Sequence, residues 1–313
     1  MLKKEVIVLN SHGVGQYACC DHMPAWGETL CVTDWRIEQD GGKGSNVAVA
    51  LGRLGIDTAY IGKVGYDPWG DLGEKWMQDA GVDTRYLYRD ASVATGTGLI
   101  LLGPDGQNTI IDGDSSSRAL TVEEIKTALD DMSGSSVLVT GFEIPVGLAL
   151  YAAQYAHDCG MKVALNPSPL PPDPIGELAF VDYLFINEVE GKYLLGLQQD
   201  TEISDNEIIH RICDKFKCAN VIMTLGGNGS LILGEAGAFT IAPIVVPKEK
   251  VINTAGAGDG YMAATIAQLI KGRPLDKAAD WASKYAALTV TIMGTIPAYR
   301  PLDEVERFIA SLE

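Results

Sequence analysis

The segment that decides the interpretation of this chain is Asn253-Thr254-Ala255-Gly256-Ala257-Gly258-Asp259-Gly260, which leads into an apolar helical pattern at 260–270. Its small residues leave several backbone N–H groups free to converge on one anion, and the positive end of the following helix favours the same charge. Asp259 would repel a phosphate there. Its place is useful if the carboxylate takes a proton from a hydroxyl that attacks the phosphate. The alternative is a glycine-rich loop in which Asp259 caps the helix.

A second glycine-rich segment, Gly41-Gly42-Lys43-Gly44-Ser45-Asn46, precedes a predicted helix at 47–54. The glycines allow a ligand to approach the backbone, while Lys43 and Asn46 offer hydrogen-bond donors at a helix N-terminus. The segment is not a Walker A loop, because Ile37 stands where the first glycine of that motif belongs and Gly44 follows Lys43 in place of Ser or Thr. The alternative is a helix start with a flexible lead-in.

A third candidate, Asn187-Glu188-Val189-Glu190, follows an apolar strand pattern at 183–186. Asn187 and Glu190 are three residues apart, so both can face one site from the first turn of a helix. Oxygen ligands at the carboxyl end of a strand suit Mg²⁺, bound through its waters. The alternative is a helix N-cap followed by an acidic first turn.

Short apolar runs alternate with helical patterns, which predicts an α/β fold with a mostly parallel sheet covered by helices on both faces. The predicted strands are 6–9, 137–140, 163–165, 183–186 and 221–225. The predicted helices are 47–54, 69–79, 146–159, 188–195 and 206–216, followed by 260–270, 275–292 and 302–312.

Two segments, 28–38 and 97–112, have alternating patterns instead, and Gly103-Pro104-Asp105-Gly106 is a strong turn signal. They predict a small antiparallel sheet that projects from the main body. Such a sheet is suited to act as a lid or as a dimer surface.

Composition narrows the possible partners of this 313-residue chain. A net charge of −17 repels phosphate backbones, so we expect no nucleic-acid partner. No apolar run approaches the roughly 20 residues of a membrane-spanning helix, and the first residues do not resemble a secretory signal, so a cytoplasmic protein is expected. The six cysteines form no CxxC pair and only four histidines are present, which excludes zinc-ligand spacing and indicates reduced, structural thiols.

One motif match is misleading. Gly13-Val14-Gly15-Gln16-Tyr17-Ala18 fits the dinucleotide fingerprint GxGxxA, with Asp34 near the usual acidic position. That fingerprint requires a helix to follow. Asp21, Pro24 and Gly27 leave no room for one, so a nicotinamide-dependent enzyme is not expected.

Taken together, the motifs resemble those of the ribokinase-like (PfkB) carbohydrate kinases over nearly the whole chain. GGKGSN at 41–46 is similar to the first family signature, and NTAGAGDG at 253–260 resembles the second, DTxGAGD. Between them stand, in the family's order, Gly141-Phe142-Glu143, Asn166-Pro167-Ser168-Pro169, the NxxE element at 187–190, and Thr224-Leu225-Gly226-Gly227-Asn228-Gly229. The resemblance implies a three-layer α/β/α sandwich in a single domain, 1–313, with a discontinuous β lid at about 14–40 and 95–113 that often clasps a second copy in a homodimer.

The resemblance also implies residue roles in an ATP- and Mg²⁺-dependent kinase acting on a small sugar-like acceptor. Asp259 would be the catalytic base, with Gly256, Ala257 and Gly258 forming the hole for charge developing on the γ-phosphate. The implied acceptor site is Gly13, Gly15, Gly42, Lys43, Asn46 and Glu143. The implied nucleotide site is Asn187, Thr224, Gly226, Gly229 and Ser283, and Glu190 would organise Mg²⁺ through water.

Two departures from the family pattern affect specificity. Gly13 and Gly15 stand where relatives have Asn and Asp, and each lost hydrogen bond to the acceptor is worth about 1–3 kcal/mol when charge-assisted. We therefore expect an enlarged pocket and an acceptor bulkier than ribose or differently substituted, with His12 or Gln16 as possible compensation. Asn253 replaces the first Asp of the second signature, so any monovalent-cation site there is weak and potassium activation weak or absent.

Other functions within and beyond this family stay open at this point. A nucleoside acceptor is the nearest rival, because Trp26 or Tyr17 could stack on a base. A sugar phosphate is less favoured, since Lys43 is the only cation among the pocket residues identified. A nucleotide-binding sensor without catalysis is a further alternative, against which the intact GAGD turn speaks.

Overall fold

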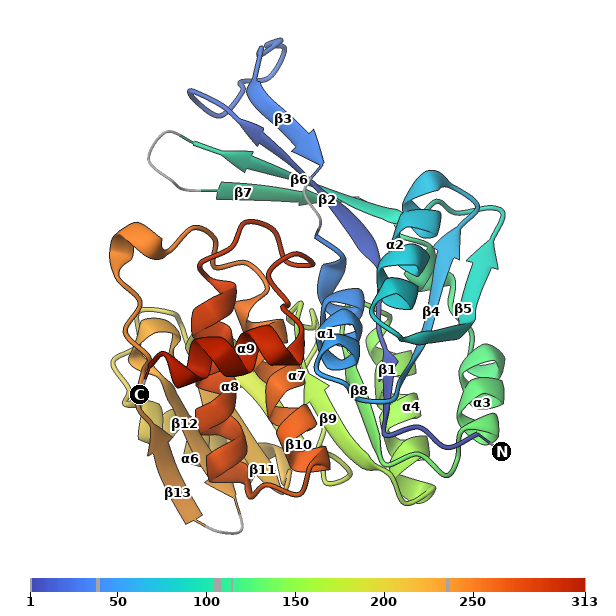
Figure 1. The fold of residues 1–313 in the computed structure, drawn as a ribbon, viewed down its shortest axis with the longest axis vertical. Helices are drawn as coiled ribbons and strands as arrows, with labels where there is room; N and C mark the ends of the chain where they lie inside the picture. The colour runs from blue at the N-terminus through green and yellow to red at the C-terminus, as the bar shows by residue number, and fades with distance from the viewer. Residues whose placement is uncertain (1, 38–39, 104–107, 114, 235–236, 313) are drawn as a thin grey trace.

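In a computed structural model, which describes residues 2–37, 40–103, 108–113, 115–234 and 237–312, the described strands form two separate sheets (Figure 1). The strands of the larger sheet are β1 (Val6–Leu9), β4 (Thr58–Gly65), β5 (Asp83–Asp90), β8 (Val137–Gly141), β9 (Lys162–Asn166), β10 (Tyr183–Asn187), β11 (Asn220–Thr224), β12 (Ser230–Gly234) and β13 (Gly237–Ile241). Their order is β13-β12-β11-β10-β9-β8-β1-β4-β5. Only the pairs β11–β12 and β12–β13 are antiparallel, so the prediction of a mostly parallel sheet is confirmed.

Helices cover both faces of this sheet, as the alternating pattern predicts. One layer contains α1 (Gly42–Arg53), α2 (Pro68–Asp79), α7 (Ala257–Ile270), α8 (Leu275–Thr289) and α9 (Leu302–Ala310). The other contains α3 (Val122–Asp131), α4 (Val146–Asp158), α5 (Glu188–Leu194) and α6 (Asp205–Phe216). Short 3-10 turns lie at Ser116–Ala119, Gly226–Asn228 and Lys248–Lys250.

Successive side chains of the first strand show how the layers are built. Val6 and Val8 belong to one hydrophobic core cluster, and Ile7 and Leu9 belong to the other. Because a strand points successive side chains to opposite faces, an uninterrupted apolar run is what a sheet covered on both sides requires. The three-layer α/β/α sandwich is therefore confirmed. Across the described ranges, no helix combines the length and apolarity needed to cross a membrane.

The smaller sheet stands apart from the body (Figure 1) and consists of β2 (Gly13–Cys19), β3 (Thr33–Ile37), β6 (Gly96–Leu102) and β7 (Asn108–Asp112), in the order β3-β2-β6-β7. The prediction of an antiparallel sheet is wrong for its central pair, because β2 and β6 are parallel. Both strands leave the body at the same place, where Gly13 pairs with Gly96, and run outward together. Of the predicted turn at 103–106, residues 104–106 lie outside the described residues.

Strand β2 also excludes the dinucleotide-binding interpretation of the GxGxxA segment. The GxGxxA segment forms β2, which pairs along its whole length with β6, so no helix opens there. This segment thus lacks the strand-to-helix turn on which that fingerprint depends.

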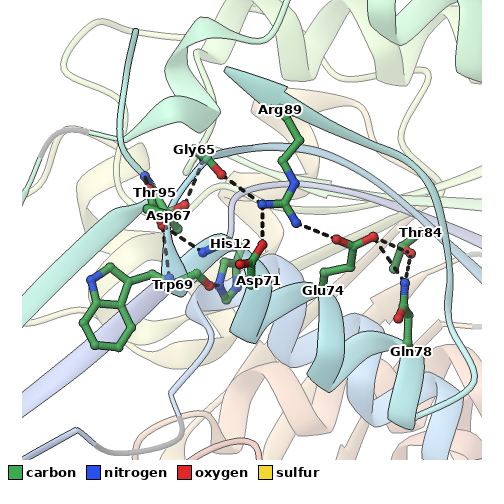
Figure 2. Close-up of polar contacts among 11 residues, drawn as sticks. His12, Gly65, Asp67, Trp69, Asp71, Glu74, Gln78, Thr84, Arg89 and Thr95 are labelled. Carbon is green, nitrogen blue, oxygen red and sulfur yellow. Dashed lines mark hydrogen bonds and ion pairs between the residues drawn. The ribbon is translucent and has the colours of Figure 1, made fainter. Parts of the chain in front are cut away.

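The base of the small sheet is tied to the body by a polar cluster shown in Figure 2. Asp67 caps α2 by accepting from the N–H groups of Trp69 (3.1 Å) and Gly70 (2.9 Å), and its second oxygen accepts from Thr95 N–H (2.8 Å) just before β6. Thr95 Oγ1 in turn accepts from Gly65 N–H (2.9 Å) at the end of β4. The entry to β6 is therefore held by the same carboxylate that starts α2.

Candidate active site

A cavity of about 1130 Å³ lies between the small sheet and the body. Gly98, Ile100 and Leu102 of β6 line it from one side, and Glu143 and Asp259 line it from the other. Its floor is formed where β1 and β8 end, which is where open α/β sheets place their ligands.

The glycine-rich turn that opens α7 has the predicted geometry for binding an anion. Gly256 has φ +73°, and a Cβ there would lie 2.5 Å from Tyr299 Oη, so only glycine fits. The Ala257 N–H donates to Thr254 O at 3.3 Å, a long bond, whereas Gly258 N–H finds no acceptor among the described residues. The turn therefore leaves backbone donors available at the positive end of a 14-residue helix.

Asp259 faces this cavity from the first turn of α7. Its side chain is 12% exposed, Asn46 Nδ2 donates to its Oδ2 at 2.9 Å, and Lys43 Nζ lies 3.6 Å from its Oδ1. The helix has no side-chain cap, so Asp259 does not serve as one. The carboxylate is held by groups from α1 and is open to a ligand.

The GGKGSN segment forms the N-cap, Gly41, and the first turn of α1, which begins at Gly42, five residues earlier than predicted. Gly42 has φ +69°, and a Cβ on Gly44 would lie 2.3 Å from Ser11 O, so these glycines let the helix pack against the exit of β1. The Asp259 carboxylate raises the pKa of Lys43, although burial acts in the opposite direction. Lys43 is thus a firmly charged ammonium beside the base.

Glu143 follows β8 and joins the same group of residues. Its Oε2 accepts from Ser11 Oγ (2.5 Å) and from Lys43 N–H (2.9 Å). Burial raises the pKa of Glu143 to about 7, even though Lys43 and Ser11 lower it. This carboxyl therefore changes its protonation near neutral pH.

Gly13 and Gly15, on β2, have neighbours that a side chain would meet. A Cβ on Gly13 would lie 3.1 Å from Gly96 O, and one on Gly15 would lie 3.0 Å from Asp40 Cβ. The space at Gly15 is thus filled by another residue and does not simply enlarge the pocket.

His12 lines the cavity, but both of its ring nitrogens already have partners in the body, which does not favour the suggestion that it compensates for these glycines. His12 is 1% exposed, and its ring points into the body, with Nδ1 2.7 Å from Ser45 Oγ and Nε2 3.2 Å from Trp69 O. Burial lowers the pKa of His12 to about 4, so the ring is neutral and structural. Gln16 is not among the residues that line the cavity.

The polar residues of the cavity wall that sequence reasoning missed include Asp40, Thr295 and Arg118, so Lys43 is not the only cation there. Thr295 Oγ1 donates to Asn46 Oδ1 (2.7 Å) and also lies 3.2 Å from Asp40 Oδ1. The available signal was an acidic residue directly before the Gly41-Gly42 pair.

Four of the five residues expected at a nucleotide site lie at or just after the ends of the neighbouring strands β10 and β11, and the fifth, Ser283, lies on α8. Asn187 ends β10, Thr224 ends β11, and the two are paired in register. Gly226 (φ +55°) and Gly229 (φ +89°) shape the turn that follows, where a Cβ on Gly229 would lie 2.1 Å from Ile241 O. Ser283 of α8 hydrogen-bonds the side chain of Tyr261. None of the five lines the cavity that contains Asp259.

Asn187 and Glu190 also form a reciprocal capping box at the start of α5. Asn187 Oδ1 accepts from Glu190 N–H (2.8 Å), and Glu190 Oε2 accepts from Asn187 N–H (2.9 Å). The capping alternative is therefore realised in this structure. It leaves the second carboxylate oxygen of Glu190 available for other contacts.

Asn253 lines the cavity beside the anion-binding turn. Its Oδ1 accepts from Ala255 N–H (3.0 Å), while its Nδ2 is buried without a hydrogen-bond partner within the described part of the chain. The amide oxygen is thus already engaged. No group of three or more His, Cys, Asp or Glu residues suited to a metal occurs in the described ranges, and the six cysteines are free thiols.

The two aromatic residues considered for base stacking differ in position. Trp26 is fully exposed and does not line the cavity. Tyr17 is 6% exposed and does line it, with its hydroxyl 3.4 Å from Asp40 Oδ2.

Comparison with solved structures defines the class of protein. A ribokinase from Giardia lamblia superposes with a TM-score of 0.87 at 20% identity, covering 99% of both chains. A ribokinase from Arabidopsis thaliana, solved in complex with ribose and ATP, gives 0.84 at 23% identity, covering 98% of this chain and 99% of the other. The fold is that of the ribokinase-like kinases.

Sequence comparison leads to the family itself. The chain is 30% identical to a ribokinase of Staphylococcus aureus over 315 residues, covering 98% of this chain and 100% of the relative. The model of the pfkB family carbohydrate kinases matches residues 38–301. The chain therefore belongs to the pfkB family of carbohydrate kinases, as the motifs indicated, and is an ATP-dependent carbohydrate kinase.

Proposed function

We propose that this kinase transfers the γ-phosphoryl group of ATP directly to a hydroxyl of a small, neutral, sugar-like acceptor, with Asp259 as the general base. The observation that supports this most is the placement of one carboxylate, one ammonium and open backbone N–H groups around a single cavity. Phosphoryl transfer needs little more than these groups, correctly positioned.

In this mechanism, the hydroxyl oxygen of the acceptor attacks the γ-phosphorus in line with the leaving ADP. Asp259 accepts the proton that this hydroxyl loses. Gly258 N–H, with Ala257 N–H and the turn at Gly256, donates to the oxygens of the γ-phosphate, where charge develops. Lys43 lies beside the base and neutralises charge on the acceptor side. Asn46 fixes the orientation of the Asp259 carboxylate.

The nucleotide would occupy the ends of β10 and β11, held by Asn187, Thr224, Gly226, Gly229 and Ser283. Bound Mg²⁺ would neutralise phosphate charge, and Glu190 would hold it through water, because only one of its carboxylate oxygens accepts a hydrogen bond within the described part of the chain. The engaged oxygen of Asn253 and its neutral amide support the view that a monovalent cation has no strong site at the turn.

The acceptor would lie against Gly13, Gly15, Gly42, Lys43, Asn46 and Glu143. The charged residues that line the cavity are Asp40, Lys43, Arg118, Glu143 and Asp259. Carboxyl groups outnumber cations, and Lys43 already neighbours Asp259, so a neutral polyhydroxy compound fits better than a sugar phosphate. A nucleoside stays the alternative acceptor, since Tyr17 lines the same cavity.

We also propose that the small sheet closes over the acceptor as a lid and pairs with the lid of a second copy. Trp35 and Ile37, on the edge strand β3, are 56% and 47% exposed. Exposed apolar residues on an edge strand favour association with another sheet. Light scattering after gel filtration should give a dimer mass, and Trp35→Asp should shift it toward the monomer; a wild-type monomer would refute this point.

The base is tested with Asp259→Asn, which keeps the shape and removes the proton acceptor. We expect ATP affinity to change by less than about threefold while acceptor-dependent ADP release falls by about 10³-fold or more. Asp276→Asn is the matched control, because Asp276 occupies the first turn of the neighbouring helix α8, away from the cavity. The variants are assayed with pentoses, hexoses, polyols and nucleosides.

Two results would contradict the proposal. Retention of most activity by Asp259→Asn would exclude this residue as the base. ATP binding without ADP release for any acceptor in the unaltered protein would favour the sensor. Turnover confined to nucleosides would select the alternative acceptor.

A further inference from the structure

Asp40 stands in the space that a side chain on Gly15 would occupy. A Cβ built on Gly15 would lie 3.0 Å from Asp40 Cβ and 3.4 Å from Asp40 Oδ2. The two segments are also joined by backbone, because Gly15 N–H donates to Asp40 O at 3.2 Å. A carboxylate therefore reaches this part of the cavity wall from the segment that precedes α1, while β2 itself offers none.

The Asp40 carboxylate is only partly used by the protein. Its Oδ1 accepts from Gly42 N–H (3.3 Å) and lies 3.2 Å from Thr295 Oγ1, and the Asn46 side chain is a further hydrogen-bonding neighbour of the carboxylate. The Tyr17 hydroxyl lies 3.4 Å from Oδ2, at the long limit of a hydrogen bond. A carboxylate can accept up to about four hydrogen bonds, so Oδ2 has capacity for a strong donor from a ligand.

Asp40 is connected to the proposed base through two side chains. Thr295 Oγ1, next to Asp40, donates to Asn46 Oδ1 (2.7 Å), and Asn46 Nδ2 donates to Asp259 Oδ2 (2.9 Å). These contacts hold the carboxylates of Asp40 and Asp259 at fixed positions relative to each other on the same cavity wall. A ligand held by Asp40 is thereby placed at a defined position relative to Asp259.

We propose that Asp40 is an acceptor-binding residue: its carboxylate fills the place left by Gly15 and accepts a hydrogen bond from an acceptor hydroxyl other than the one phosphorylated. The proposal rests on the kinase function proposed above and adds a residue that selects the substrate. Its ligand class is a neutral polyol or sugar, because an anionic substituent would face Asp40 and Glu143 together. It also favours glycine at position 15, since a Cβ there would lie 3.0 Å from Asp40 Cβ and would require that side chain to shift by a few tenths of an ångström.

The test uses the full chain and whichever of D-ribose, D-xylose, D-arabinose, D-fructose and ribitol gives the highest kcat/KM. Loss of a charge-assisted hydrogen bond predicts that Asp40→Ala raises acceptor KM by about 10–100-fold, with ATP KM unchanged and kcat changed less. Asp40→Asn, which keeps the contact to Gly42 N–H possible, should have an intermediate effect. Asp57→Ala, on an exposed residue paired with Lys4, is the control and should behave as the unaltered protein.

A double-mutant comparison of Gly15→Ala and Asp40→Ala distinguishes a role of Asp40 in acceptor binding from a purely structural role. Gly15→Ala alone should raise acceptor KM in the same direction, because its Cβ pushes Asp40 aside. Combined with Asp40→Ala it should add less than about twofold, since the carboxylate it displaces is already gone. A purely structural role would instead change ATP KM and the unfolding midpoint in proportion.

The possible outcomes distinguish the role of Asp40 in acceptor binding from the proposed kinase mechanism. An acceptor KM within about twofold of the unaltered value in Asp40→Ala, with transfer still lost in Asp259→Asn, overturns the role of Asp40 and leaves the kinase mechanism standing. Fully additive effects of Gly15→Ala and Asp40→Ala also overturn it. No transfer to any acceptor by the unaltered protein refutes both.

Discussion

Two polar clusters flank the start of the small sheet, and they differ in how their hydrogen-bonding groups are used. At the base of the small sheet, both oxygens of Asp67 accept from backbone N–H groups, and Arg89 donates to Gly65 O, Asp71 and Glu74 (Figure 2). In the cavity, by contrast, Asp40 and Asp259 keep carboxylate capacity that the described chain does not use.

The difference indicates which polar groups are structural and which are available to a ligand. A buried network satisfied within the protein fixes the fold, whereas a partly satisfied one costs free energy unless a ligand completes it. Neutralising the first cluster should therefore affect stability and spare substrate affinity. Neutralising a carboxylate of the cavity cluster should lower substrate affinity and leave stability nearly unchanged.

The largest effect outside the base itself is expected for Lys43→Ala. Lys43 is the cation next to Asp259 and Glu143, so its loss leaves both carboxyls facing the acceptor without a counter-charge. Acceptor KM should rise by about 100-fold and kcat fall less, measured by acceptor-dependent ADP release. Lys75→Ala, an exposed lysine paired with Asp79 on α2, should change neither. A loss confined to kcat would place Lys43 on the phosphoryl side instead.

The next largest effect is expected for Asp67→Ala, which removes the central carboxylate of the polar cluster at the base of the small sheet. The substitution leaves the N–H groups of Trp69, Gly70 and Thr95 without their acceptor, so the free energy of unfolding should fall by about 1–3 kcal/mol in a urea titration. Although burial alone would raise it, these hydrogen bonds lower the pKa of Asp67. Its stabilising contribution is therefore present above pH about 4 and is lost as pH falls further.

Asp71→Ala is the matched control for this prediction. Asp71 lies on the same helix and pairs with the same cluster through Arg89 (2.7 Å), but its side chain is 73% exposed. The expected loss is below about 1 kcal/mol. Equal losses of unfolding free energy in Asp67→Ala and Asp71→Ala would contradict the distinction between the two clusters. So would a raised acceptor KM in Asp67→Ala with stability unchanged.

The sequence predicted the parts of this molecule whose chemistry is local. The turn at 253–260 and the start of α1 are recognisable because small residues, a helix start and a functional side chain occur within a few positions. The strands β1, β8 and β10 were predicted from uninterrupted apolar runs.

Long-range contacts were not predictable in the same way. Asp40 matters because Gly15, 25 residues earlier, leaves it space, and nothing local marks that pair. Strand β4 was missed because Lys63 and two glycines interrupt its apolar pattern. Lys63 is nevertheless buried, since Glu124 (2.8 Å) and Ala119 O (2.8 Å) satisfy its ammonium.

A smaller effect is expected for the pH dependence of stability at Glu143. Because burial raises the pKa of Glu143 from an ordinary 4.5 to about 7, the folded state holds this proton more tightly than the unfolded chain. The associated stability is complete below about pH 4.5 and is lost as pH rises through 7. Glu143→Gln should remove this loss, gaining about 1–2 kcal/mol relative to the unaltered protein between pH 5 and 8 in thermal unfolding. Parallel pH profiles would contradict it.

The smallest effect concerns potassium. Asn253 offers a neutral amide, and one lone pair of its oxygen already accepts from Ala255 N–H, so a monovalent cation gains no charge and at most one weak oxygen contact from it. Replacing sodium by potassium should change the rate of acceptor-dependent ADP release by less than about twofold. Asn253→Asp restores a carboxylate at this position and should introduce a potassium dependence that sodium does not reproduce. A steep potassium response in the unaltered protein would mean that the cation is held by neighbouring backbone oxygens, and the side chain at 253 would then not control it.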